Sequence, residues 1–203
     1  MNKENSLEAA KRQKILEAAE VVFTQKGFFK ATIDEIAQKA QIAKGTIYLY
    51  FPDKPSIFIG LLAKKLAEVK TRLLEISREN LTSEAKLRKI FDCLARGMFN
   101  SQQNTLFSTS SEKVITISQA VMKEFEQKVK PELKRIIKII TEIINQGIKN
   151  QEFRQLDPKL LALLFMSTIR SLSLLKFYPH NYQYSSKSLK ELFFEILKPR
   201  GGQ

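Results

Sequence analysis

Eight residues between positions 32 and 54 have side chains, or a bare backbone, that suit contact with a nucleic acid. They are Thr32, Lys44, Gly45, Thr46, Tyr48, Leu49, Tyr50 and Lys54. Ammonium and hydroxyl groups bind phosphates, whereas hydroxyl and apolar groups contact base edges and thymine methyl groups. We expect Thr46 and Leu49 to contact bases and Lys44 to reach guanine or phosphate. The DNA backbone is the expected partner of Thr32, Tyr48, Tyr50 and Lys54.

The apolar residues of the same stretch predict two short helices joined by a tight turn. Four of them recur at the spacing of one helical face: Ile33, Ile36, Ala37 and Ala40. A second helix beginning near Ala43 would turn three side chains inward: Ile47, Tyr50 and Phe51. Thr32 and Glu35 have the spacing of a capping box, in which each side chain accepts a hydrogen bond from a free backbone amide. This layout is that of a helix-turn-helix, whose second helix enters the major groove. Two ordinary amphipathic core helices are the alternative.

The flanking residues extend this pattern into a family resemblance. Ile15-Leu16-Glu17-Ala18-Ala19 precedes Phe23 and Lys26-Gly27-Phe28, and the run from Ala43 to Phe51 is followed by Pro52-Asp53-Lys54. Residues 10–60 resemble the N-terminal DNA-binding domain of TetR-family transcriptional regulators. Glu152-Phe153-Arg154 with Leu156-Asp157-Pro158 is similar to that family's entry into a late helix. The resemblance implies a dimeric repressor that binds a near-palindromic DNA operator and is released by a small effector.

Two residues depart from the pattern of that family. Gln41 stands where the turn commonly has glycine, and a left-handed backbone there should cost about 1 kcal/mol. Ala43 stands where a serine commonly caps the recognition helix, so the first turn of that helix should be held less firmly.

The composition favours an all-α protein. The chain has 203 residues, 43% of them hydrophobic, with seven glycines and six prolines and no alternating apolar and polar run. We expect about nine helices from the apolar periodicity. Residues 1–54 would form the three-helix DNA-binding domain, after a mobile arm that ends near Glu8, and residues 55–203 the effector-binding and dimerisation domain. Pro131 either starts a helix or kinks a longer one.

The net charge of +13 indicates a polyanionic partner, either nucleic acid or an anionic membrane. Residues 1–54 contain nine Lys or Arg and seven Asp or Glu, so their net charge is +2 and the remaining +11 lies elsewhere. Charge alone therefore does not locate the DNA site. The excess could be a solvated surface, or it could belong to an alternative function, a basic helical module that binds an anionic membrane or an acidic protein.

Residues for catalysis or metal binding are sparse. The only histidine, His180, lies in a predicted loop, and the only cysteine, Cys93, fits a reducing compartment. No Ser/His/Asp set, glycine-rich phosphate loop or zinc-ligand spacing is present. We therefore expect no enzyme activity, cofactor or metal. We also expect a cytoplasmic protein, because residues 1–14 do not resemble a signal peptide and the apolar run 160–177 is too short to span a bilayer.

Two C-terminal helices are expected to form a homodimer. These are residues 158–177, apolar nearly all the way round from residue 160 onward, and residues 186–198, which carry one apolar stripe. A helix without a polar face must be covered on every side. Two such helices from each subunit would form an intermolecular four-helix bundle.

The family resemblance also implies a pocket for a hydrophobic or amphipathic effector in the C-terminal body. Apolar and methionine side chains suit such a pocket, although plain core packing explains each of them equally well. The candidates are Phe91, Leu94, Met98, Phe99, Phe107, Met122, Phe125, Ile140 and Met166.

Overall fold

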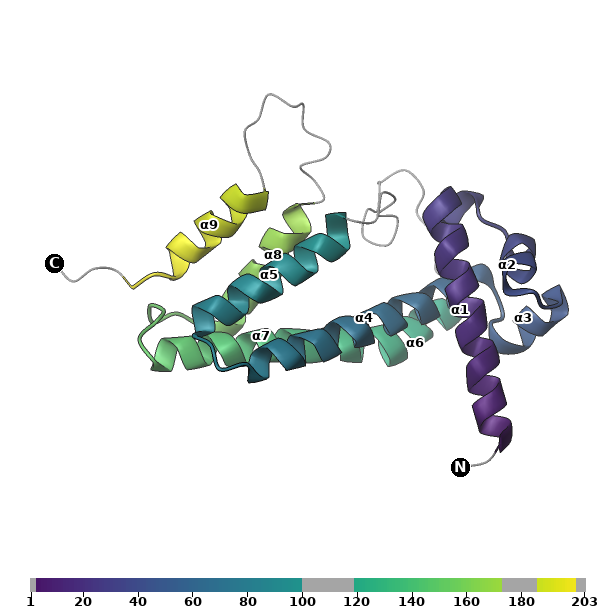
Figure 1. Cartoon of the computed structure of the whole chain (residues 1–203), viewed down its shortest axis with the longest axis horizontal. Helices are drawn as coiled ribbons and strands as arrows, with labels where there is room; N and C mark the ends of the chain where they lie inside the picture. The colour runs from purple at the N-terminus through teal and green to yellow at the C-terminus, as the bar shows by residue number, and fades with distance from the viewer. Residues whose placement is uncertain (1–2, 100–118, 173–185, 200–203) are drawn as a thin grey trace, which may run out of the picture. The chain divides into compact units, whose positions relative to one another are not determined.

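The computed structural model describes residues 3–99, 119–172 and 186–199 (Figure 1). All regular structure in these ranges is helical, which confirms the all-α class. The chain divides into two compact units, one within residues 1–66 and 102–131 and the other within residues 67–101 and 132–203. The predicted domain boundary at residue 54 stays a prediction. None of the described helices combines the length and apolarity needed to cross a membrane.

The first unit begins with α1 (Lys3–Lys30), α2 (Ile33–Ala40) and α3 (Lys44–Tyr50) (Figure 1). Helix α1 starts at Lys3, so the prediction of a mobile arm to Glu8 is wrong. Gly27 has φ 75° and ψ 159°, which breaks the helical path near the C-terminus of α1 as expected for a glycine. The break lets Phe28 turn back into the core, where its side chain is buried.

The core of the first unit joins α1, α2 and α3 to the first turns of α4 (Lys54–Arg78). Completely buried side chains come from all four helices: Ile15, Ile36, Ile47 and Ile57. Gly60 allows α4 to approach closely, because a Cβ at this position would lie 2.9 Å from the Phe51 ring and 3.2 Å from Leu16. The start of α4 is therefore part of the packing that holds the two short helices.

A π-helical turn, Phe125–Val129, lies between α6 (Gln119–Glu124) and α7 (Lys130–Lys149). Pro131 follows it within the first turn of α7. Proline has no N–H, and its ring crowds the carbonyl four residues earlier, so a regular α-helical path is disfavoured there. The backbone widens instead, with the Lys130 N–H donating to the Phe125 carbonyl. The sequence left open whether Pro131 starts a helix or kinks a longer one. In the structure it follows a distortion within a helical run that continues from α6 into α7.

In the second unit, α5 (Ser83–Phe99), α8 (Pro158–Ser171) and α9 (Ser186–Leu197) pack against one another (Figure 1). Aromatic side chains fill the space between them. Phe165 lies between Phe91 and Phe193, with ring centroids 5.9 Å and 5.1 Å away. Asp157 caps α8 by accepting hydrogen bonds from the Lys159 N–H at 2.7 Å and the Leu160 N–H at 3.0 Å, which confirms the predicted start of this helix.

Candidate DNA-binding interface

The N-terminus of α2 is fixed by the predicted capping box. The Thr32 hydroxyl accepts from the Glu35 N–H at 3.3 Å, and Glu35 Oε2 accepts from the Thr32 N–H at 3.0 Å. Lys26 of α1 adds an ion pair to Glu35 Oε1 at 2.6 Å. The Lys26 ammonium, followed by the Thr32 amide, lowers the pKa of Glu35. The predicted backbone-contacting residue Thr32 therefore lies at a well-defined helix start.

The turn between α2 and α3 forms a Schellman motif. Gln41 has φ 51° and ψ 48°, so the expected left-handed residue is present without a glycine. The Ile42 N–H donates to the Ala37 carbonyl and the Gln41 N–H to the Gln38 carbonyl, both at 3.1 Å. Ala43 makes no side-chain cap to α3, as its residue type implies.

Changing Gln41 to Gly is expected to raise the free energy of unfolding by about 1 kcal/mol, because glycine adopts the left-handed region without the Cβ clash. Urea denaturation would measure the change. Gln38→Gly is the matched control, since Gln38 is exposed inside α2. Glycine there should lower stability by about 1 kcal/mol. A loss of stability in both variants would argue against strain at Gln41.

The third helix presents an outer face that no described part of the chain covers. Ile47 is completely buried and anchors the helix, whereas Leu49 is 82% and Tyr48 is 46% exposed. Thr46 and Tyr50 are half-buried. A Cβ at Gly45 would have no neighbour within 4 Å among the described residues, so their packing does not require glycine there.

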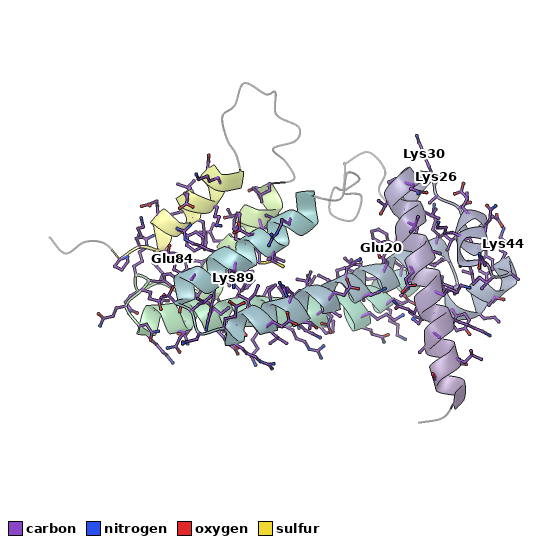
Figure 2. The ribbon with its side chains drawn as sticks, viewed as in Figure 1. Glu20, Lys26, Lys30, Lys44, Glu84 and Lys89 are labelled. Carbon is purple, nitrogen blue, oxygen red and sulfur yellow. The ribbon has the colours of Figure 1, made fainter. Side chains whose placement is uncertain are left out.

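Lys44 opens the third helix and pairs with Asp34 of α2. Lys44 Nζ lies 2.9 Å from Asp34 Oδ2, and the lysine side chain remains 49% exposed (Figure 2). Asp34 raises the pKa of Lys44. The ammonium is accessible to an anion, but a phosphate would have to share it with this carboxylate.

Lys54 and Arg12 have internal partners that sequence reasoning did not find. Lys54 Nζ donates to the carbonyls of residues 28, 29 and 31 at 2.8, 3.3 and 2.9 Å. Burial lowers the pKa of Lys54. The guanidinium of Arg12 lies 4.2 Å from the centroid of the Phe51 ring, and its Nη1 donates to the Tyr50 carbonyl at 3.4 Å. These partners are 23 (Lys54 to Ala31) to 39 (Arg12 to Phe51) residues distant in sequence, so no local spacing indicates them.

The described effector candidates are divided between the two units. In the second unit, Phe91 and Ile140 are buried and Leu94 and Met166 are half-buried, while Met98 and Phe99 lie at the end of α5. Met122, 47% exposed, and the half-buried Phe125 belong to the first unit. Phe107 and His180 lie outside the described residues. The pocket therefore stays a prediction. No group of acidic, His or Cys residues within the described ranges is placed to hold a metal ion.

Comparison with known proteins places this geometry in a family. The profile of "Bacterial regulatory proteins, tetR family" matches residues 15–61, from the middle of α1 into α4. The fatty acid metabolism regulator protein of Bacillus subtilis (strain 168) is 31% identical over 164 residues, which are 78% of this chain and 79% of that protein. This chain belongs to the TetR family. It is a DNA-binding transcriptional regulator and not an enzyme.

Two solved structures share the fold over most of this chain. FadR from Bacillus subtilis in complex with stearoyl-CoA aligns with a TM-score of 0.69 at 25% identity, over 91% of this chain and 98% of that chain. AibR in complex with isovaleryl coenzyme A and operator DNA aligns with a TM-score of 0.64 at 14% identity, over 93% and 98% of the two chains. At that identity, the likeness to AibR shows the fold alone.

Proposed function

We propose that this TetR-family regulator is a homodimeric repressor that binds a near-palindromic operator and is released by an amphipathic effector of the acyl-CoA type. The observation that carries the proposal is the open outer face of α3, with Leu49 82% exposed above a completely buried Ile47. A helix that is packed on one face and exposed on the other suits insertion into a major groove.

The proposed contacts follow from the positions of the side chains on α2 and α3. Thr46 and Leu49 contact base edges or thymine methyl groups, and Lys44 reaches guanine or phosphate. Gly45 lets the backbone of α3 approach the DNA, which gives a reason for a glycine that internal packing does not need. The hydroxyl groups of Thr32, Tyr48 and Tyr50 bind phosphates and set the register of the helix.

The proposed dimer uses an apolar face on α8 and α9. Leu160, Leu163 and Leu164 are 66%, 51% and 39% exposed, and they recur at the spacing of one helical face. Leu192 of α9 is 59% exposed. The opposite face of α8 is buried in the subunit core through Leu161, Ala162, Phe165 and Ile169. A second copy of the same helices would cover the exposed leucines in a symmetric interface.

The effector proposal rests on the relatives. FadR from Bacillus subtilis was solved with stearoyl-CoA, a molecule with an apolar acyl chain and a charged coenzyme. This class fits the hydrophobic or amphipathic effector that the sequence predicts. Release from DNA requires the effector to bind the DNA-incompetent conformation more tightly than the DNA-bound one. A cytoplasmic location follows from this function and stays a prediction.

Titration of a duplex from the gene's own upstream region tests the proposal. The duplex should be retarded specifically, in a salt-sensitive manner, and stearoyl-CoA should release it. Free coenzyme A and free stearate are the controls for the effector. Equal retardation of unrelated duplexes would contradict binding to a specific operator. If the protein also sediments with anionic vesicles, that result would support the alternative of a basic module that binds membranes.

A further inference from the structure

Lys54 is the first residue of α4, and its side chain ends at the junction between α1 and α2. An ammonium group has three protons to donate. The carbonyls of Phe28, Phe29 and Ala31 accept them at 2.8, 3.3 and 2.9 Å. The same ammonium lies 4.7 Å from the centroid of the Phe28 ring, which adds a cation–π contact. The donor capacity of Lys54 is therefore used inside the chain.

Other hydrogen bonds fix the backbone on both sides of the Lys54 contacts, at the start of α4 and at the start of α2. Asp53 Oδ1 accepts from the Ser56 N–H at 2.7 Å and so holds the first turn of α4. Ala31 directly precedes Thr32, the residue that caps α2. Because Gly27 breaks the helical path, residues 28–31 need other partners for their carbonyls at the end of α1. Lys54 supplies a partner for three of these four carbonyls, those of Phe28, Phe29 and Ala31, and joins the start of α4 to the start of α2.

We propose that Lys54 is a positioning residue that fixes α2, and through it the recognition helix, to the first turn of α4, and that it does not bind a DNA phosphate. A phosphate could reach this ammonium only by displacing one of its carbonyl partners. Movement of the first turn of α4 would be transmitted to α2 through the same contacts. This inference rests on the proposed DNA-binding function and replaces the phosphate contact expected from the sequence.

Two substitutions separate positioning from phosphate binding. Lys54→Met keeps an unbranched stem and removes the donors, whereas Lys54→Arg keeps the charge with a planar fork that does not match three carbonyls. Positioning predicts that both variants lose operator affinity by about tenfold, which corresponds to about 1.4 kcal/mol. Affinity for random duplex should stay within about twofold, because it depends on phosphate contacts that remain in place. The slope of log K against log salt should also stay unchanged.

A phosphate contact predicts a different result. Lys54→Met would lower the magnitude of the salt slope by about 0.9 per subunit, weaken binding to every duplex, and be rescued by Lys54→Arg. That result, or operator affinity equal to wild type in Lys54→Met, would overturn the inference. All titrations are made well below the midpoint of thermal unfolding, so that a loss of stability alone does not change the affinity. Wild-type protein that selects no operator would instead refute the proposed function.

Lysine acetylation of the wild-type protein gives a second test that does not depend on how the variants fold. Lys54 should react slowly with acetic anhydride both with and without operator, because its ammonium is already occupied. Lys30, which is exposed at the end of α1, is the reactive reference in free protein (Figure 2). Mass spectrometry that finds Lys54 as reactive as Lys30 in free protein, and protected only by DNA, would contradict the inference.

Discussion

Replacing Leu49 with Glu is expected to lower operator affinity by at least about 100-fold. Leu49 is 82% exposed on α3, so the substitution removes no internal packing. A lost base contact is worth about 1–3 kcal/mol, and both subunits of a dimer lose it. The doubled loss corresponds to about 30-fold or more at 1.4 kcal/mol per factor of ten, before repulsion between the new carboxylate and the phosphates is added. Fluorescence anisotropy at fixed salt would measure the change.

Leu156→Glu is the matched control for this prediction. Leu156 is 41% exposed and belongs to the second unit, so the same change of charge is made in the unit that does not contain α3. We expect this variant to bind operator within about threefold of wild type, since its net-charge change acts only through screened long-range electrostatics. The midpoint of thermal unfolding should be similar in all three proteins. An equal loss of affinity in both variants would indicate a general charge effect and not a reading helix.

Replacing Leu163 with Glu is expected to convert the dimer into monomers. Leu163 is 51% exposed on α8, between the exposed Leu160 and Leu164, while the opposite face of the helix stays packed. The symmetric interface would bury two new carboxylates without partners, at a cost of several kcal/mol each. Light scattering should find about twice 23.4 kDa for wild type and 23.4 kDa for the variant.

Loss of the dimer should also weaken operator binding by at least about 100-fold, because a single helix-turn-helix contacts only one half-site. Leu81→Glu is the control, since Leu81 is also exposed (41%) but lies outside α8 and α9. Helical content measured by circular dichroism should be equal in the two variants. A wild-type mass of 23.4 kDa, or a Leu163→Glu protein that remains dimeric, would contradict the proposed interface.

The features that could be predicted from the sequence are those held by neighbours a few residues apart. Thr32 and Glu35 form the capping box, Asp157 caps α8, and Gln41 takes the left-handed backbone of the turn. Each depends on residue types within one or two helical turns, so spacing alone was sufficient. The apolar residues predicted for α8 lie on two faces of the helix, one packed in the subunit core and one exposed.

The features that could not be predicted depend on how separate segments meet. The residue type and position of Lys54 suit a phosphate contact, whereas its three carbonyl acceptors belong to the last turn of α1 and to Ala31 after it. Arg12 contacts Tyr50 and Phe51 across the core of the first unit. The pairing of Lys44 with Asp34 depends on the angle between α2 and α3, which the spacing of residues does not give.

Recovery of genomic DNA by the purified protein tests the central claim most directly. Sheared DNA from the source genome is mixed with the wild-type chain or with Leu49→Glu, and the bound fragments are sequenced. Wild type should enrich fragments that share a near-palindrome with half-site centres about 10 base pairs, or a multiple of that, apart, and Leu49→Glu should not. Wild-type fragments without a shared motif, or the same motif recovered equally by Leu49→Glu, would contradict the account.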